Sequence, residues 1–271
     1  MTAHDDVQDA AHAGSTRQAR ATEIARAKLT WSLRVVGVRD GLHVLDAEMV
    51  TLDLCDVLEF EEPSAAVVEV VTEPPADRIA GRVLEDTIVR RAMAAVGRPA
   101  HVVVTKRIPP GAGLGGGSAD AAAVLRWADH PDLATALALG SDVPFCLRGG
   151  HALVRGVGEE LEPLPPLSAT VTLALLPFGV DTASCYRAYD SLEGPAKHHD
   201  RNDLTRAAEQ VAPALRGVRQ HLEALCGSAF SLAGSGSTLF CEGDPMDLGH
   251  RGDDSVGTQF GEVRLVLART D

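Results

Sequence analysis

Residues 106–127 read KRIPPGAGLGGGSADAAAVLRW, and this stretch decides the fold of the chain. It follows the apolar run Val102–Val104, which is typical of a buried strand. Its second half is rich in alanine, so we predict a helix with Ser118 as its N-cap and Asp120 in its first turn. The sequence therefore predicts a strand, a glycine-rich loop and a helix N-terminus in immediate succession.

The segment between the predicted strand and helix, residues 109–117, has the properties of a phosphate-binding loop, and we name it the glycine loop. Its five glycines allow positive φ angles and the close approach of a ligand to the backbone. The N–H groups of the loop and of the first helical turn would then point at an anion. The loop lacks the Gly-Lys-Ser/Thr ending of a Walker A motif, and its spacing differs from the dinucleotide fingerprint. It is therefore either a phosphate loop of another class or a plain glycine-rich turn.

The pattern Pro-x-x-x-Gly-Leu-Gly-Gly-Gly-Ser-Ala-Asp-Ala-Ala resembles the phosphate loop of the GHMP kinases. It looks most like the branch that phosphorylates a cytidine-diphosphate-linked methylerythritol in the non-mevalonate isoprenoid pathway. The resemblance implies that ATP is bound here and that the hydroxyl of Ser118 reaches a Mg²⁺ ion. The residues expected to bind the triphosphate are Pro109, Pro110, Gly111, Ala112, Gly113, Leu114, Gly115, Gly116, Gly117, Ser118 and Ala119.

A second informative stretch is Gly140–Phe145, which reads GSDVPF. Pro144 disfavours helical geometry at Val143, so we expect Asp142 at the end of an element, facing a cleft rather than inside a helix. An isolated aspartate in this setting is usually a cap or a turn residue. The related kinases carry Gly-(Ala/Ser)-Asp-Val-Pro here, and this resemblance implies that Asp142 is the catalytic base.

Lys28 lies in a segment where Leu29, Trp31 and Leu33 alternate with polar residues, which predicts a half-buried strand. In that strand Lys28 would point away from the core side chains, as a solvated lysine does. The resemblance assigns the segment to the active-site lysine of the family and implies that Lys28 lies close to Asp142. The family asparagine that follows is Thr30 in this chain.

Two aromatic positions concern the second substrate. His43 follows an Asp-Gly turn, in a place where the related kinases have Gly-Tyr-His-x-Leu with the tyrosine and histidine on a cytosine ring. The histidine matches, but Leu42 replaces the tyrosine. Tyr186 matches a family position whose ring packs against the same base. From the sequence, His43 is either an ordinary sheet histidine or a base ligand, and Tyr186 is either a helix core residue or a stacking ring.

Two further stretches match the family. Asn202–Leu204 corresponds to the Asn-Asp-Leu that opens a helix, and Pro213 should divide the helical pattern after it into two helices. The stretch Ala233–Ser237 resembles the family's third motif, a glycine turn between strands that helps to close the active site.

Composition limits the classes of function. The chain has 271 residues, of which 45% are hydrophobic, enough for a sizeable core. The formal net charge of −13 disfavours general binding to nucleic acid or to anionic membranes. The five cysteines are scattered and odd in number, and no signal peptide or long apolar run is found. We therefore expect a reduced cytoplasmic protein with small-molecule partners, namely ATP and a nucleotide-linked polyol.

The resemblance implies an α+β fold of two domains: a ribosomal protein S5 domain 2-like N-terminal domain and an α/β-sandwich C-terminal domain, with the active site between them. We expect a disordered extension at residues 1–23, an ATP-binding domain at 24–162 and a substrate domain at 163–271. The expected activity is that of an ATP-dependent kinase of the cytidine-diphosphate-linked substrate. A kinase of another small alcohol and a non-catalytic nucleotide-binding descendant remain the alternatives, and the sequence does not predict the oligomeric state.

Overall fold

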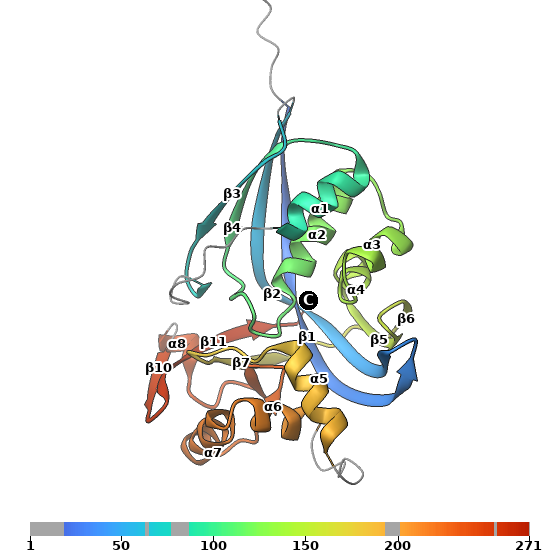
Figure 1. The fold of residues 1–271 in the computed structure, drawn as a ribbon. Coiled ribbons are helices and arrows are strands. Elements are labelled where there is room, and N and C mark those ends of the chain that lie inside the picture. Colours follow the sequence, from blue (N-terminus) through green and yellow to red (C-terminus); the bar gives the residue numbers. More distant parts are fainter. Residues whose placement is uncertain (1–18, 63–64, 77–86, 193–200, 252–253, 271) are drawn as a thin grey trace, which may run out of the picture.

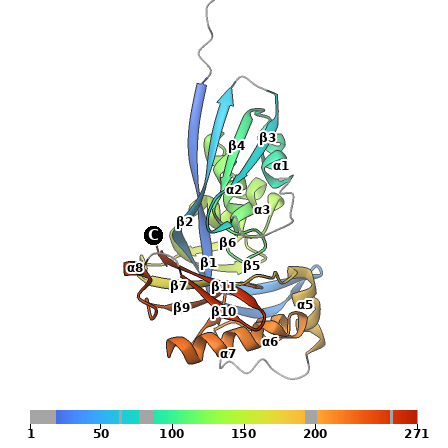
Figure 2. The same ribbon diagram turned by 90° about the vertical axis from the view of Figure 1, so that its left-hand side faces the viewer.

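The computed structural model describes residues 19–62, 65–76, 87–192, 201–251 and 254–270. The long strands β1 (Ala19–Arg39) and β2 (Leu42–Glu62) form an antiparallel hairpin, and β1 extends along both halves of the molecule (Figures 1 and 2). Residues 19–23, expected in the disordered extension, are instead the first residues of β1, and residues 1–18 lie outside the described residues.

The first sheet is built around β2. On one edge β2 pairs with β1; on the other, its C-terminal part pairs with β4 (His101–Lys106) and its N-terminal part with β5 (His151–Gly156). The strands β3 (Val67–Thr72), parallel to β4, and β6 (Glu160–Pro163), antiparallel to β5, complete it. One face is covered by α1 (Thr87–Val96), α2 (Gly116–Trp127), α3 (Leu133–Leu139) and α4 (Val143–Arg148) (Figure 1).

The second sheet belongs to the C-terminal half and has the strand order β10-β11-β7-β9-β8. Its strands are β7 (Thr170–Leu175), β8 (Ser231–Leu232), β9 (Leu239–Glu242), β10 (Asp254–Thr258) and β11 (Gly261–Arg269). The helices of this half are α5 (Thr182–Ser191), α6 (Thr205–Val211), α7 (Ala214–Cys226) and α8 (Leu248–Arg251) (Figure 2). The expected α+β fold is confirmed, and the predicted division of two helices at Pro213 is found between α6 and α7.

Apolar packing joins the two halves. One buried cluster combines Leu29 and Val104 of the first sheet with Leu173 and Phe240 of the second. A second cluster combines Phe145 and other residues of the N-terminal half with the apolar faces of α6 and α7. The boundary expected at residues 162–163 falls at the end of β6, but both cores extend across it.

Two local expectations were wrong. The helix after the glycine loop begins at Gly116 rather than after Ser118, because Gly115 adopts the left-handed conformation at the N-cap and the free N–H groups of the helix start there. Val143, expected outside helical geometry, is the first residue of α4, because Pro144 lies in the first turn of that helix, where a missing N–H costs nothing. Asp142 itself lies at the end of the element, as expected. The helical spacing of Leu84, Ile88, Ala92 and Val96 predicts a helix near residues 82–96. Its first part lies outside the described residues, and α1 is its described portion. No helix in the described ranges is both long and apolar enough to span a membrane.

Candidate active site

The glycine loop ends at the N-terminus of α2, which points toward the junction of the two halves (Figure 1). Gly111, Gly113 and Gly115 have φ angles of 73°, 81° and 69°, a region that favours glycine. The first intrahelical hydrogen bond is donated by Ala119 to the carbonyl of Gly115 at 2.8 Å. The N–H groups of residues 116–118 therefore lack an intrahelical acceptor and are available to an anion.

Both halves hold the loop in place through backbone hydrogen bonds. The N–H of Lys28 in β1 donates to the carbonyl of Leu114 at 3.0 Å, and the N–H of Thr238 donates to the carbonyl of Ala112 at 3.1 Å. The approach is close at Gly113, where an added Cβ would lie 2.4 Å from the carbonyl oxygen of Ala233. The turn that resembles the third motif therefore packs directly on the glycine loop.

The structure brings Lys28 and Asp142 together. The Lys28 Nζ lies 3.2 Å from the Asp142 Oδ2 and donates to the Thr30 Oγ1 at 3.0 Å. Lys28 is buried, with 6% of its side chain exposed, whereas 29% of the Asp142 side chain is exposed. The lysine is therefore a fixed cation at the base of the site, and the aspartate is the member of the pair that a ligand can reach.

The neighbours of this pair belong to the glycine loop and to α4. An added Cβ at Gly115 would lie 2.7 Å from the Lys28 Cγ, so the lysine stem packs against the loop. Asp142 is at the N-cap of α4, but its side chain makes no capping hydrogen bond. The interpretation of Asp142 as a capping residue therefore lacks the contact that would support it.

Lys28 was expected on the polar face of a regular strand, and this expectation was wrong. The pairing of β1 with β2 is irregular between Arg26 and Lys28 and again between Thr30 and Ser32. These irregularities interrupt the alternation of faces, and Lys28, Leu29 and Thr30 are all buried in succession.

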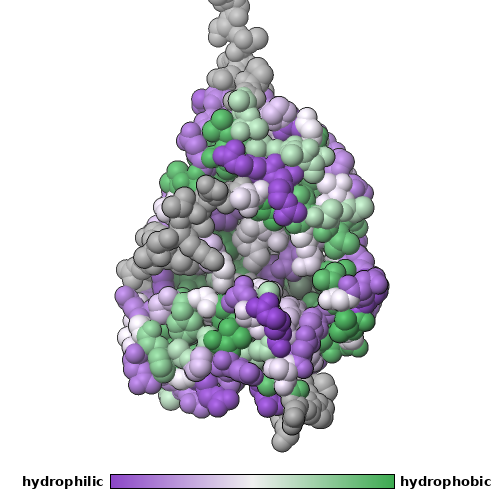
Figure 3. All heavy atoms as spheres, in the orientation of Figure 1, coloured by the Kyte–Doolittle hydropathy of each residue, from purple (hydrophilic) through white to green (hydrophobic). Residues whose placement is uncertain are grey.

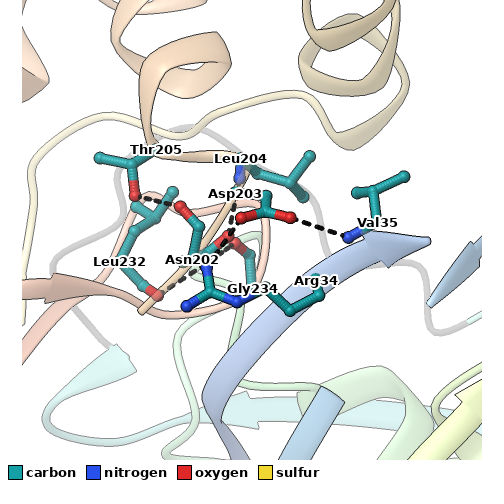
Figure 4. Close-up of polar contacts among 8 residues, drawn as sticks. All are labelled: Arg34, Val35, Asn202, Asp203, Leu204, Thr205, Leu232 and Gly234. Carbon is teal, nitrogen blue, oxygen red and sulfur yellow. Dashed lines mark hydrogen bonds and ion pairs between the residues drawn. The ribbon is translucent and has the colours of Figure 1, made fainter. Parts of the chain in front are cut away.

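A polar junction at residues 202–205 supports the third-motif turn from the C-terminal side (Figure 4). The Asn202 side-chain amide donates to the carbonyls of Leu232 and Gly234 at 2.8 and 2.7 Å. The carboxylate of the next residue, Asp203, accepts from the Arg34 guanidinium at 2.7 Å and from the Val35 N–H at 3.1 Å. The junction thus ties β1 to the turn whose Gly234 lies next to Lys28.

His43 and Tyr186 lie together in the structure. Their rings stack with centroids 4.6 Å apart, and the Tyr189 ring lies nearly perpendicular to His43 with centroids 6.2 Å apart. The His43 Nε2 lies 2.7 Å from the Asp190 Oδ1. Burial, and in second place the Asp142 carboxylate, raise the pKa of the Tyr186 phenol above its usual value. Leu42, the residue directly before His43 in β2, is 58% exposed.

A cavity of about 860 Å³ borders the first residues of the glycine loop. It is lined by residues 109–112 of the loop, by residues 175–182 of the C-terminal half, and by Pro75, Ser237, Glu262 and Arg264. Lys28 and Asp142 do not line it. The molecule is also hollowed between its two halves on the face shown in Figure 3. The glycine loop therefore borders a cavity that residues of the C-terminal half also line.

The residues at the loop fit a nucleotide phosphate, because the α2 N-terminus offers N–H groups without an intrahelical acceptor and the positive-φ glycines of the loop let an anion approach the backbone. Within the described residues, no group of three or more His, Cys, Asp or Glu side chains could hold a metal ion. A Mg²⁺ ion that accompanies a nucleotide needs only one or two protein ligands, since phosphates and water supply the rest. Ser118 and the exposed carboxylate of Asp142 are oxygen ligands of the kind that such an ion prefers.

Comparisons with known proteins agree with this geometry. The GHMP kinases N terminal domain model matches residues 80–150, which include the glycine loop and Asp142. The 4-diphosphocytidyl-2-C-methyl-D-erythritol kinase of Paracoccus denitrificans is 35% identical over 241 residues, which cover 80% of this chain and 85% of that protein. The enzyme of the same name from Pelotomaculum thermopropionicum is 41% identical over 196 residues, or 65% of this chain and 66% of its own. The chain belongs to the 4-diphosphocytidyl-2-C-methyl-D-erythritol kinase family.

Solved structures with a similar fold include one member of this kinase family and more distant kinases. A 4-(cytidine 5'-diphospho)-2C-methyl-D-erythritol kinase matches with a TM-score of 0.67 and 31% identity, covering 91% of this chain and 99% of that one. The mevalonate kinase of L. major matches with a TM-score of 0.65 at 11% identity, covering 94% of this chain and 97% of that one, which shows the shared fold alone.

Sequence reasoning missed two features of the site. One is Asp190 beside His43, which no spacing in the sequence relates to it. The other is the buried Lys106, the first residue of the stretch 106–127, to which no sequence pattern assigned a function. Its position three residues before the glycine loop was the available signal.

Proposed function

We propose that this chain transfers the γ-phosphoryl group of ATP to the 2-hydroxyl of 4-diphosphocytidyl-2-C-methyl-D-erythritol, in the non-mevalonate route to isoprenoid precursors. The family to which the chain belongs supports the choice of reaction. The observation that carries the proposal is the Lys28–Asp142 pair at 3.2 Å, packed against a glycine loop that starts a helix. Phosphoryl transfer needs a positioned donor, an acceptor base and charge neutralisation, and this arrangement offers all three.

Asp142 is the group that would accept the proton of the substrate hydroxyl. A base must be reachable, and its carboxylate is the exposed member of the pair. Lys28 would stabilise the negative charge that develops on the attacking oxygen. Thr30 keeps the lysine in place by accepting its hydrogen bond.

The glycine loop and the first turn of α2, residues 109–119, would bind the triphosphate through backbone N–H groups. Mg²⁺, when bound with the nucleotide, would neutralise phosphate charge, and the Ser118 hydroxyl is the protein ligand we propose for it. Backbone N–H groups would supply most of the hydrogen bonds to the phosphates. This explains how a chain of net charge −13 can bind an anionic substrate.

His43 and Tyr186 would bind the cytosine base. The two rings lie together and offer aromatic faces of the kind on which a planar base stacks. Leu42, an aliphatic residue at the position of the family tyrosine, favours a second candidate function, which is phosphorylation of another small alcohol.

The test is a turnover assay with purified protein, ATP, Mg²⁺ and the cytidine-diphosphate-linked methylerythritol. We expect ADP release that depends on this substrate, and no turnover by Asp142→Asn, which should still bind ATP with wild-type affinity. Turnover on a different alcohol only would favour the second candidate. Undiminished turnover in Asp142→Asn would reject the assignment of the base.

A further inference from the structure

A buried ion cluster lies directly behind the glycine loop. It consists of Asp56 in β2, Lys106 at the end of β4 and Asp120 in the second turn of α2. Both aspartates are fully buried, and Lys106 is 5% exposed. None of the three is reachable by a nucleotide, and the proposed reaction gives none of them a role.

The cluster ties the two ends of the loop to the sheet. The Lys106 ammonium contacts both the Asp56 and Asp120 carboxylates. The other oxygen of Asp56 accepts from the N–H groups of Arg107 and Ile108 at 2.5 and 2.7 Å, where the chain leaves β4. Asp56 thus holds the chain before the glycine loop, and Asp120 holds the helix after it. Both carboxylates contact the same cation, the Lys106 ammonium.

The lysine also lies close to the phosphate-binding end of α2. A Cβ added at Gly116, the first residue of the helix, would lie 3.4 Å from the Lys106 Nζ. The ammonium is therefore immediately behind the N–H groups that the triphosphate would contact.

The cluster carries two carboxylates and one ammonium, a net charge of −1 behind an anion site. Burial lowers the pKa of Lys106, but the attractions of Asp120 and Asp56 outweigh it and raise the pKa above its usual value, so the lysine stays charged. Removing this cation would leave a net charge of −2 at the same distance from bound phosphate. In a protein interior such a change is poorly screened.

We infer that Lys106 is a positioning residue for phosphate binding: it offsets Asp56 and Asp120 electrostatically and fixes both ends of the glycine loop. The inference rests on the proposed function in one respect, namely that the glycine loop binds the phosphates of ATP. It predicts that affinity for an adenine nucleotide follows the net charge of the cluster.

The experiment measures the Kd of MgADP by titration calorimetry for wild type and three variants. The cluster charge is −1 in wild type, −2 in Lys106→Met, 0 in Asp120→Asn and −1 again in the double variant. We expect Lys106→Met to weaken binding at least tenfold, since one unit charge within about 12 Å has at least this effect at an effective dielectric constant of about 20. Asp120→Asn should bind at least as tightly as wild type, and the double variant should regain most of the lost affinity.

A purely structural role gives the opposite order, because the double variant would then be the weakest binder. If Lys106→Met does not fold, the comparison of wild type with Asp120→Asn still decides, since weaker binding by Asp120→Asn would overturn the inference. The matched control is Glu209→Gln, which removes one buried carboxylate that pairs with Arg216 and Arg219 in the C-terminal half. It should leave the Kd of MgADP unchanged.

Steady-state kinetics adds a second readout. In Lys106→Met the KM for ATP should rise, while the KM for the acceptor and kcat change less than threefold. Because calorimetry needs no acceptor, the two proposals can fail separately. A chain that binds MgADP in the expected order but phosphorylates no methylerythritol substrate supports the inference and overturns the proposed function. Normal turnover on that substrate without the expected order of MgADP affinities supports the proposed function and overturns the inference about Lys106.

Discussion

At the scale of single residues, the site combines one buried cation with one accessible carboxylate. Lys28 cannot move far, because Gly115 packs against its stem and Thr30 accepts its hydrogen bond. Within the part of the chain that the structure describes, Asp142 is held by its position at the start of α4 and by the ion pair. Asp142 can therefore adjust to an incoming substrate hydroxyl, as a general base must. Lys28 is already in position to stabilise the negative charge.

The ring of Tyr186 is expected to bind the cytosine base. Tyr186→Ala should raise the KM for the cytidine-linked substrate by roughly tenfold or more, since stacking of one base contributes about 1–3 kcal/mol. Tyr186→Phe keeps the ring and should stay close to wild type in KM. Initial rates at saturating ATP measure both, and an equal rise in the two variants would contradict a stacking role.

At the scale of elements, the site depends on the contact between the glycine loop and the β8–β9 turn. A Cβ at Gly113 would meet the Ala233 oxygen at 2.4 Å and the Gly236 oxygen at 2.9 Å. Gly113→Ala should therefore push the turn away from the loop and raise the KM for ATP at least tenfold, since a displacement of about 1 Å can be this costly. Steady-state kinetics with varied ATP provides the measurement.

Gly150→Ala is the matched control for Gly113→Ala. Gly150 has a φ angle of 82°, close to the 81° of Gly113, but an added Cβ would meet nothing within 4 Å. Both variants share the backbone strain, and only one has the clash. Similar kinetic effects in the two would mean that strain, rather than the loop–turn contact, is responsible.

Asn202 supports the same turn from the other side. Asn202→Ala removes two hydrogen bonds from buried carbonyls, which should lower the free energy of unfolding by roughly 2–4 kcal/mol. Urea unfolding followed by far-UV circular dichroism measures this change. Ser191→Ala, which removes an exposed hydrogen bond at the end of α5, should change the same free energy by less than about 0.5 kcal/mol. A loss below about 1 kcal/mol in Asn202→Ala would contradict the supporting role.

The sequence was sufficient for local features and insufficient for long-range ones. The strand, the glycine loop and the helix at residues 101–127 were predictable because apolar runs and glycines act over a few residues. The burial of Lys28 was not, because the irregular pairing that causes it involves β2. Nor was the environment of Asp120, which was expected to face the helix dipole and instead pairs with Lys106, fourteen residues earlier in the chain.

At the scale of the whole molecule, the two halves share their cores. Trp31 of β1 packs against Phe240 of β9, while Trp127 of α2 stacks on Phe60 within the N-terminal half. Because both apolar clusters cross between the halves, we expect one cooperative unfolding transition rather than two. The same urea midpoint should appear in tryptophan fluorescence and in far-UV circular dichroism. Two separated midpoints would mean that the halves unfold independently.

The irregular pairing of β1 near Lys28 has a consequence for how this stretch tolerates change. Each shift in pairing moves the following side chains to the other face of the strand. Deleting or adding one residue between Arg26 and Ser32 would therefore turn the ammonium toward solvent without altering its identity. Variation among natural forms of this protein should accordingly include substitutions in that interval far more often than changes of its length.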